Sequence, residues 1–396
     1  METKSSLMNI EHYLRNSSQI QEIFGSNEIE FKEISSGINE VYILQSKRSE
    51  KKALLKRYLP HFKNTPSEVL NQNRAHFEAQ SMQIFAKYAA ESVAKIYFED
   101  RKNSIVVMEY IEHLSNLNRA LQSAIELSLV APKIAFAMSS TAFYTSRFNA
   151  DFSERQKCLD FFLQNEMKTV SVVFIFDPLI EMFEAASQDT GHETNPIFHE
   201  SRYNKKELLL KIKRLKTSFY EDSDALIHGD FKGGALLLNQ EKISIIDFEF
   251  SSFAPMGYDL GALFHSFVAM SISYSVTETN QRYQNLLLEN IEALWQSYQE
   301  NFLRLHREQS SFEDERAVQK HLQKVLQESV GFFGVHMLSM SIALVIPDAA
   351  VVVKSKEELE YMYYKRVYAI AKIAILKHET FTSIEQFLKL VASHLR

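Results

Sequence analysis

The sequence predicts a two-part α+β protein, with a small β-rich N-terminal part and a larger, mostly helical C-terminal part. Two observations carry this prediction. Strand-like runs gather in the first 112 residues, with one long helical stretch among them. Nearly everything after Pro255 shows the apolar spacing of three and four residues that is typical of helices. The length of 396 residues also favours two folding units over one core.

The N-terminal part is expected to begin with a helix over residues 6–24. Strands are predicted at 29–36, 40–47 and 52–59, with a turn signal at Ser36-Gly37-Ile38-Asn39 between the first two. A helix over 66–90 and strands at 93–100 and 103–111 follow. Because the connections are short, we expect one small sheet carrying one main helix and ending near Glu112.

The C-terminal part is expected to be helical, apart from short strands around 226–250 and a polar loop at 186–204. Apolar periodicity predicts helices at 115–127, 131–147, 151–168, 204–220, 257–276, 281–306, 313–345, 356–378 and 383–394.

Composition argues against several classes of protein. The formal net charge is −6, so no basic surface for nucleic acid is expected. Cys158 is the only cysteine, which favours a reducing, cytoplasmic location, and the first residues lack the apolar core of a signal peptide. The apolar run 330–353 contains His336, Pro347 and Asp348. We therefore expect a buried helix followed by a break there, and no membrane span.

The stretch LIHGDFKGGALLLN, residues 226–239, places Asp230 on a loop between two apolar runs. It is either a catalytic acid or a polar residue of a turn. Asp247 ends the next apolar run, so the two carboxylates are expected to converge from neighbouring strands. Glu249 would lie on the same side of an extended chain as Asp247. Carboxylates of this kind suit Mg²⁺ held together with phosphates.

Lys56 lies in the third predicted strand, where it is either exposed to solvent or part of a phosphate site. The second interpretation needs an acidic partner, and Glu78 on the following helix is the candidate. A strand lysine held by a helix glutamate, a loop aspartate and metal-binding acids are the parts that phosphoryl transfer requires.

These parts occur in the order found in kinase-like phosphotransferases. Through HGD and IDFE the chain resembles the superfamily of aminoglycoside phosphotransferases and choline kinases. Through LLKRYLP, VVMEYIEHLSNLNRAL and above all IIDFEFSSFAPMGYDLGA it resembles the 5-methylthioribose kinase family as a divergent member. The resemblance implies a bilobal, protein-kinase-like fold. Residues 1–112 would form the nucleotide-binding lobe, and 113–396 the helical lobe with the catalytic loop and acceptor site.

The resemblance also implies roles for single residues. Asp230 would accept the proton of a sugar hydroxyl, and Asp259 would brace the catalytic loop. Asp247 and Glu249 would hold Mg²⁺. The implied ATP-binding residues are Gly37 and Asn39 over the phosphates, Lys56 and Glu78 at the α- and β-phosphates, and the adenine hinge of Met108, Glu109 and Ile111.

The implied activity is ATP-dependent phosphorylation of a sugar hydroxyl, on 5-methylthioribose or a related ribose- or nucleoside-like compound. A homodimer is the expected assembly. The alternative is a catalytically impaired, kinase-like protein that binds nucleotide or sugar in a regulatory role. A protein kinase is disfavoured, because no segment with an A-P-E-like ending follows Asp247.

The chain departs from the family pattern in the catalytic loop and in one late helix. Ala235 replaces a metal-binding Asn or Ser, and Lys232 replaces a His. Lys232 is either an exposed loop lysine or a catalytic residue that stabilises charge in the transition state. Ser339 and Met340 replace a pair of arginines near the sugar, and neither residue supplies the charged, rigid set of donors that an arginine offers. His336 nearby is expected to be a satisfied core residue.

Overall fold

The computed structural model describes residues 9–26, 28–34, 37–63, 65–149, 151–187, 205–309, 314–342 and 357–395. It consists of two compact units. The first comprises Met1–Gln83 and Ala94–Glu112, and the second comprises Ile84–Val93 and His113–Arg396. The predicted α+β organisation is confirmed, with a sheet in the first unit and mostly helices in the second. The units differ from the predicted lobes only at residues 84–93.

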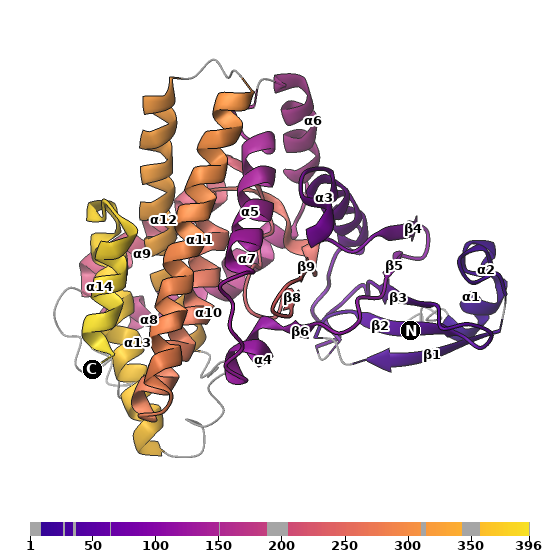
Figure 1. The fold of residues 1–396 in the computed structure, drawn as a ribbon, viewed down its shortest axis with the longest axis horizontal. Helices are drawn as coiled ribbons and strands as arrows, with labels where there is room; N and C mark the ends of the chain where they lie inside the picture. Colours follow the sequence, from indigo (N-terminus) through magenta and orange to yellow (C-terminus); the bar gives the residue numbers. More distant parts are fainter. Residues whose placement is uncertain are drawn as a thin grey trace. The chain divides into compact units, whose positions relative to one another are not determined.

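The first unit contains a five-stranded antiparallel sheet with the order β1-β2-β3-β5-β4 (Figure 1). The predicted strands are all present. Their bounds are β1 (Ile29–Ile34), β2 (Glu40–Ser46), β3 (Lys52–Arg57), β4 (Ile96–Asp100) and β5 (Ile105–Glu109).

Two short helices, α1 (Ile10–Asn16) and α2 (Ser18–Phe24), replace the single helix predicted over 6–24. Ser17 separates them, because its backbone is extended and its side chain accepts a hydrogen bond from the N–H of Ile20 as the N-cap of α2. Both helices add apolar side chains to one core cluster with the sheet. Its buried members are Leu14, Ile20, Phe24, Tyr42, Leu44, Ala53, Leu55, Ile105 and Val107.

The main helix of this part, α3 (Arg74–Ala89), begins eight residues later than predicted. The chain before it pairs with residues 60–62 instead, since the N–H of Leu70 donates to the Pro60 carbonyl and His61 bridges to Val69. The last turns of α3 belong to the second unit, where the Tyr88 ring stacks on that of Tyr144 at 4.3 Å. This packing explains why residues 84–93 depart from the predicted lobe boundary.

The second unit is a helical assembly with a few very short strands (Figure 1). Most of its predicted helices are confirmed with shifts of at most three residues at their ends, but α4 and α6 end five and six residues earlier than predicted. The helix α8 and all but the first two residues of α7 were not predicted. Besides the 3₁₀ turns η1 (Ala90–Ser92) and η6 (His378–Thr380), its helices are α4 (Leu117–Gln122), α5 (Ala131–Thr145), α6 (Phe152–Phe162), α7 (Met167–Ile175), α8 (Asp177–Ser187), α9 (Lys205–Glu221), α10 (Gly257–Val276), α11 (Gln281–Glu308), α12 (Glu315–Ile342), α13 (Glu357–Lys377) and α14 (Ile384–His394).

The helix α10 packs against both α11 and α12 in the centre of this unit (Figure 1). Gly257 and Gly261, one turn apart on α10, allow a close approach to α12. A Cβ at Gly261 would lie 2.6 Å from the backbone nitrogen of Phe333, and one at Gly257 would lie 2.7 Å from that of Ser329. Without side chains at these two positions, the residues around them on α10 and α12 come into direct contact.

The apolar run that begins at Val330 is buried in α12 up to Ser339, as predicted for a core helix. Pro347 and Asp348, the predicted break, lie outside the described residues, and so does most of the predicted loop at 186–204. In the part of the chain that the structure describes, no helix is long and apolar enough to cross a membrane.

The short strands predicted around 226–250 are present and form two separate sheets. β7 (Ala225–Ile227) pairs with β10 (Ser252–Ala254), while β8 (Leu236–Leu238) lies between β6 (Ser115–Asn116) and β9 (Ile243–Ile245). The two sheets carry the loops in which the predicted catalytic and metal-binding acids lie.

Candidate active site

Lys56 and Glu78 form a buried ion pair in the first unit. The Lys56 Nζ lies 2.8 Å from Glu78 Oε2, and the two side chains are only 3% and 2% exposed. Side chains alternate along a strand, so Lys56 lies on the face of β3 opposite to Leu55, which is in the core cluster. The interpretation of Lys56 as a solvent-facing lysine is therefore wrong, and the predicted pairing with Glu78 is present.

The predicted phosphate-covering turn is held by Asn39. Its Oδ1 accepts a hydrogen bond of 2.8 Å from Nη2 of Arg74, and both side chains are buried. Arg74 also donates through Nη1 to the Leu59 carbonyl, at 2.7 Å. The Asn39 side chain thus fastens the turn to α3, which leaves backbone groups of Gly37 to Asn39 as the candidates for phosphate contact. A Cβ at Gly37 would meet nothing within 4 Å.

The predicted hinge comprises the end of the inner strand β5 and the residues after it. Met108 is buried opposite Leu54, and the N–H of Glu109 donates to the Lys95 carbonyl at 2.8 Å. Ile111 lies beyond the end of β5 and is half-buried. The role of this segment in binding adenine remains a prediction.

In the second unit, Asp230 lies on the loop after β7 and is ion-paired with Lys232. Nζ of Lys232 is 2.8 Å from Oδ1 of Asp230, and the two side chains are 42% and 29% exposed. The neighbouring Asp230 carboxylate raises the pKa of Lys232, with a smaller contribution from Asp247. Lys232 is thus partly exposed, yet its ammonium group is held at the carboxylate of the predicted catalytic base.

Asp259, on the first turn of α10, braces this loop as predicted. Its carboxylate accepts hydrogen bonds from the N–H groups of His228, at 2.6 Å, and Gly229, at 3.0 Å. Burial raises the pKa of Asp259 to about 7, and the two backbone hydrogen bonds oppose this shift. The N-cap of α10 is Met256, so Asp259 lies within the first turn of the helix.

The loop requires a glycine at position 229. Gly229 has φ of +84°, and a Cβ there would lie 2.3 Å from the Phe250 carbonyl oxygen. The backbone can thus approach the segment after Asp247 closely.

The His228 side chain connects the two acid-bearing loops, a role that the sequence analysis missed. Its Nδ1 accepts a hydrogen bond from the N–H of Asp230 at 3.2 Å, and its Nε2 lies 2.8 Å from the Ile246 carbonyl oxygen. Because Nδ1 is the acceptor, the hydrogen must be on Nε2, which donates to Ile246. The imidazole thereby links Asp230 to the residue that precedes Asp247.

The predicted geometry of the metal-binding acids is wrong in two respects. The strands before Asp230 and Asp247, β7 and β9, lie in different sheets, and the two loops are linked by the hydrogen bonds of His228 instead. Asp247 and Glu249 are also not on an extended chain. Asp247 has a left-handed backbone, with φ of 64° and ψ of 52°, and begins the 3₁₀ turn η3 (Phe248–Phe250).

The turn η3 separates the surroundings of the two acids. Phe248 is buried within it, with its ring 4.8 Å from that of His228 and 4.9 Å from that of Phe85. Asp247 is exposed, whereas Glu249 is 3% exposed. Across the described ranges, no cluster of three or more His, Cys, Asp or Glu side chains is arranged to hold a metal ion. Mg²⁺ commonly takes one or two carboxylates and completes its shell with water and phosphate oxygens, which fits an exposed acid such as Asp247.

Ala235 acts through its backbone. It is buried, its N–H donates to the Lys232 carbonyl at 2.9 Å, and its own carbonyl accepts from the N–H of Ile246 at 2.9 Å. The residue thus closes the loop that carries Asp230 and ties it to the end of β9, while its side chain offers no ligand.

The late helix α12 carries Ser339 and Met340, which are buried and half-buried respectively. One turn earlier, His336 is buried as predicted, but it is not satisfied. Its Nε2 has no hydrogen-bond partner among the residues that the structure describes. The predicted burial of His336 is therefore confirmed, and the prediction that its hydrogen bonds are satisfied is wrong.

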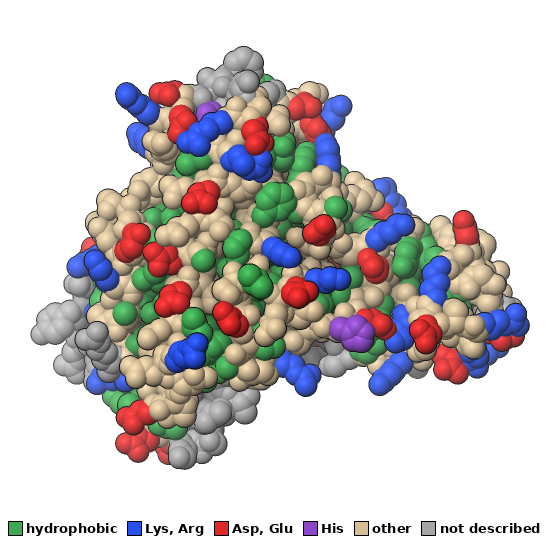
Figure 2. All heavy atoms as spheres, viewed as in Figure 1, with side chains coloured by type: hydrophobic (Ala, Val, Ile, Leu, Met, Phe, Trp, Pro, Cys, Tyr) green, Lys and Arg blue, Asp and Glu red, His purple; other side chains and the backbone are tan. Residues whose placement is uncertain are grey.

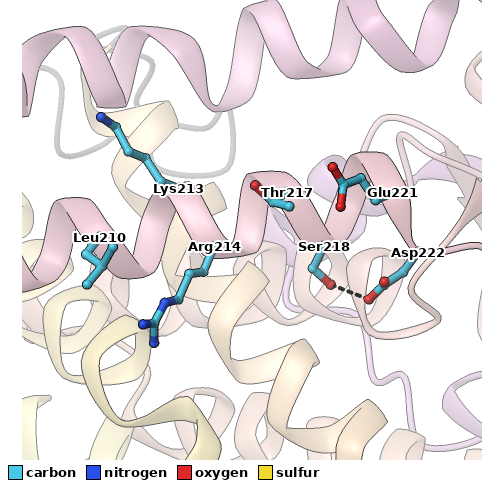
Figure 3. A pocket seen from close by; sticks show the side chains of 7 residues that line it. All are labelled: Leu210, Lys213, Arg214, Thr217, Ser218, Glu221 and Asp222. Atoms are coloured by element: carbon cyan, nitrogen blue, oxygen red, sulfur yellow. Dashed lines mark hydrogen bonds between the residues drawn. The ribbon is translucent and has the colours of Figure 1, made fainter.

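A hollow on the surface of α9 has a lining that includes none of the residues described above. Figure 3 shows its lining, which comes from α9 and the residue after it, with Ser218 donating a hydrogen bond to Asp222. None of the predicted site residues line it. On the face drawn in Figure 2, acidic and basic side chains are interspersed.

Comparison with known proteins links the chain to phosphotransferases. Residues 206–300 match the phosphotransferase enzyme family. The chain is 27% identical to a methylthioribose kinase of Geobacillus sp. (strain WCH70) over 374 residues, which cover 91% of this chain and 89% of that kinase. It is also 27% identical to a methylthioribose kinase of Bacillus cereus (strain AH820), over 79% of this chain and 78% of that kinase.

Among solved structures, the chain is similar to a choline kinase from Cryptosporidium parvum Iowa II, with a TM-score of 0.49 and 17% identity, covering 94% of this chain and 98% of that one. An ethanolamine kinase from Plasmodium vivax has a TM-score of 0.47 and 11% identity, covering 94% and 92%.

Proposed function

We propose that the chain is a divergent member of the phosphotransferase superfamily to which the methylthioribose kinases belong, and that it transfers the γ-phosphoryl group of ATP to a sugar hydroxyl. The names of its relatives, which are methylthioribose kinases, support 5-methylthioribose or a related ribose-containing compound as the acceptor. The observation that carries the proposal is the Asp230 loop. Asp259 braces it, His228 links it to the Asp247 segment, and Lys232 lies at the Asp230 carboxylate.

In the proposed reaction, Asp230 orients the acceptor hydroxyl and takes its proton as the hydroxyl oxygen bonds to the γ-phosphorus. The bond between this phosphorus and the bridging oxygen breaks, and ADP leaves with the bond's electron pair. Proton transfer by a positioned carboxylate of this kind contributes about 10²–10⁴-fold to a rate. The Lys232 ammonium group stabilises negative charge on the transferred phosphoryl group, in addition to its ion pair with Asp230.

The remaining roles concern the nucleotide. Lys56, positioned by Glu78, contacts the α- and β-phosphates, and the backbone of Gly37 to Asn39 covers them. Asp247 is the principal carboxylate for Mg²⁺, with Glu249 as the second. When bound, Mg²⁺ neutralises charge on the phosphates. The segment from Met108 to Ile111 binds adenine through its backbone.

One observation favours a second candidate function. Ala235 cannot supply the metal ligand that the superfamily pattern has at this position. A protein impaired in this way would bind nucleotide or sugar without transfer and act in regulation. Asp230, which the chain retains from the superfamily pattern and pairs with Lys232, favours the kinase over this alternative.

The direct test is to incubate the protein with ATP, Mg²⁺ and a panel of ribose derivatives that includes 5-methylthioribose, and to follow products by ³¹P NMR. We expect a new phosphomonoester resonance together with ADP. A folded protein that binds ATP but phosphorylates no member of the panel would favour the regulatory alternative.

A further inference from the structure

Two buried histidines lie together in the second unit, His265 on α10 and His336 on α12. They are 7% and 4% exposed, and their ring centroids are 6.4 Å apart. The ring of Tyr258 lies 4.9 Å from that of His336. Because Tyr258 and His265 are two helical turns apart, they lie on one face of α10, and His336 of α12 contacts both.

The same helix α10 holds the catalytic loop at the residues next to this pair. Asp259 accepts hydrogen bonds from the loop backbone, and two turns later Ser266 accepts one from the N–H of Gly233 at 3.1 Å. In the sequence, Asp259 directly follows Tyr258, and Ser266 directly follows His265. Helix α10, which carries His265, is therefore fastened to the loop of Asp230 and Lys232 on either side of the pair.

Both imidazoles are uncharged near neutral pH. Burial lowers the pKa of His265 to about 4, and the charge of Lys232 contributes to this shift. Burial also lowers the pKa of His336 well below its ordinary value, with smaller contributions from His265 and Lys232.

His336 has an unused hydrogen-bonding atom at this place. Its buried Nε2 is without a partner in the described part of the chain, and leaving such an atom unsatisfied is unfavourable. Ser339 and Met340, three and four residues later, lie on the same face of α12 and are also uncharged. A neutral imidazole can donate and accept hydrogen bonds, which suits a hydroxyl group better than a carboxylate, a phosphate or an amine.

We propose that His265 and His336 form the part of the acceptor subsite that binds the hydroxyl groups of an uncharged polyol next to Asp230, and that they determine specificity for such acceptors. This inference rests on the proposed function, because it assigns the acceptor side of that reaction. The hydroxyl of the bound acceptor satisfies Nε2 of His336, and the absence of a cation in the pair disfavours anionic acceptors.

The test compares His336→Phe, His336→Gln and the control His321→Phe. His321 is also buried on α12 with an unpartnered Nε2, but it lies fifteen residues earlier, about 22 Å along the helix. Binding of 5-methylthioribose, D-ribose and D-ribose 5-phosphate is measured by calorimetry in the presence of Mg²⁺ and a non-hydrolysable ATP analogue. Turnover with ATP is measured in parallel, and melting temperatures verify folding.

We expect His336→Phe to raise the Kd and KM of the uncharged sugar about tenfold, with less than a twofold change in the KM for ATP, because one hydrogen bond is lost. His336→Gln, which keeps a polar group near the position of Nε2, should lose no more than about threefold. His321→Phe should leave both constants unchanged. D-ribose 5-phosphate should bind no more tightly than D-ribose.

The outcomes separate this inference from the proposed function. Transfer to a sugar with a KM that is the same in wild type and His336→Phe overturns the inference and leaves the function standing. Sugar binding that depends on His336, without any transfer, supports the subsite and overturns the kinase. Binding of neither uncharged sugar overturns the inference whatever the turnover shows.

A second measurement covers the case in which His336→Phe does not fold. The imidazole ¹⁵N resonances of wild-type protein, assigned with His336→Gln, should shift at His336 when 5-methylthioribose is added and remain unchanged at His321. No shift at His336 under conditions of saturating sugar would contradict the subsite.

Discussion

Nε2 of His228 lies 2.8 Å from the carbonyl oxygen of Ile246, and this contact joins the loop of Asp230 to the segment of Asp247. The strands that lead to these acids belong to separate sheets, so strand pairing does not bring them together. The imidazole performs this task, with its other nitrogen accepting from the N–H of Asp230.

His228→Phe tests this link. Phenylalanine keeps a ring against Phe248 and Phe231 but forms neither hydrogen bond. We expect kcat to fall by about 10²-fold, because small displacements of a catalytic group have effects of this size. Steady-state kinetics with ATP and 5-methylthioribose, on protein with an unchanged melting temperature, measures the effect. A kcat within twofold of wild type would show that the two loops are positioned without His228.

Asp259 provides a prediction about pH. Its pKa is raised to about 7 in the folded protein, from an ordinary value of 3.8, so the folded state binds more protons than the unfolded state between these limits. The contribution of Asp259 to the free energy of unfolding is therefore greatest at low pH and declines as pH rises from about 4 to 7. Asp259→Asn removes the titration, and the advantage of wild type over this variant should shrink across that range. Urea unfolding at several pH values gives the difference, and an advantage that grows with pH would indicate an ionised carboxylate.

Ala235→Ser tests the missing metal ligand. A serine hydroxyl at this buried position of the loop would offer one oxygen to Mg²⁺, so we expect a several-fold lower Mg²⁺ concentration at half-maximal activity. Ala235→Val, which adds bulk without a ligand, is the matched control. If serine and valine have the same effect on the Mg²⁺ titration, the side chain at position 235 does not face the metal.

Lys56→Met tests the proposed contact of Lys56 with the phosphates of ATP. Loss of the ammonium group should reduce kcat/KM for ATP by about 10²-fold, as for the loss of one preorganised electrostatic contact. Lys52→Met is the control, since Lys52 is on the same strand and pairs with Glu112, but its side chain is 32% exposed. A similar loss in both variants would point to damage of the sheet rather than to a specific phosphate contact.

Sequence periodicity predicted those elements whose apolar residues repeat clearly and whose ends carry strong signals. The helix α10 was predicted to its last residue, since Pro255 precedes it and its apolar spacing is continuous. The helix α7 was missed beyond its first residues, because MKTVSVVFI is apolar on nearly all sides and shows little helical periodicity. The break at Ser17 was missed because a cap depends on local backbone geometry.

The site was predictable where a single loop carries it, as for Asp230 and its Lys232 neighbour. The pairing of Lys56 with Glu78 also followed from the order of strand and helix. The contact of His265 with His336 was not predictable, because it depends on how closely α10 and α12 pack. Gly257 and Gly261 on α10 allow the close approach of the two helices. Nothing in the sequence around either histidine indicates that the two helices are neighbours.

The most direct measurement of the central claim is single-turnover transfer of ³²P from [γ-³²P]ATP to 5-methylthioribose, compared between wild type and Asp230→Asn. The variant should bind ATP with wild-type affinity and transfer about 10²–10⁴-fold more slowly, because the proton acceptor is lost. Equal transfer rates in the two proteins would contradict the assignment of Asp230 as the catalytic base.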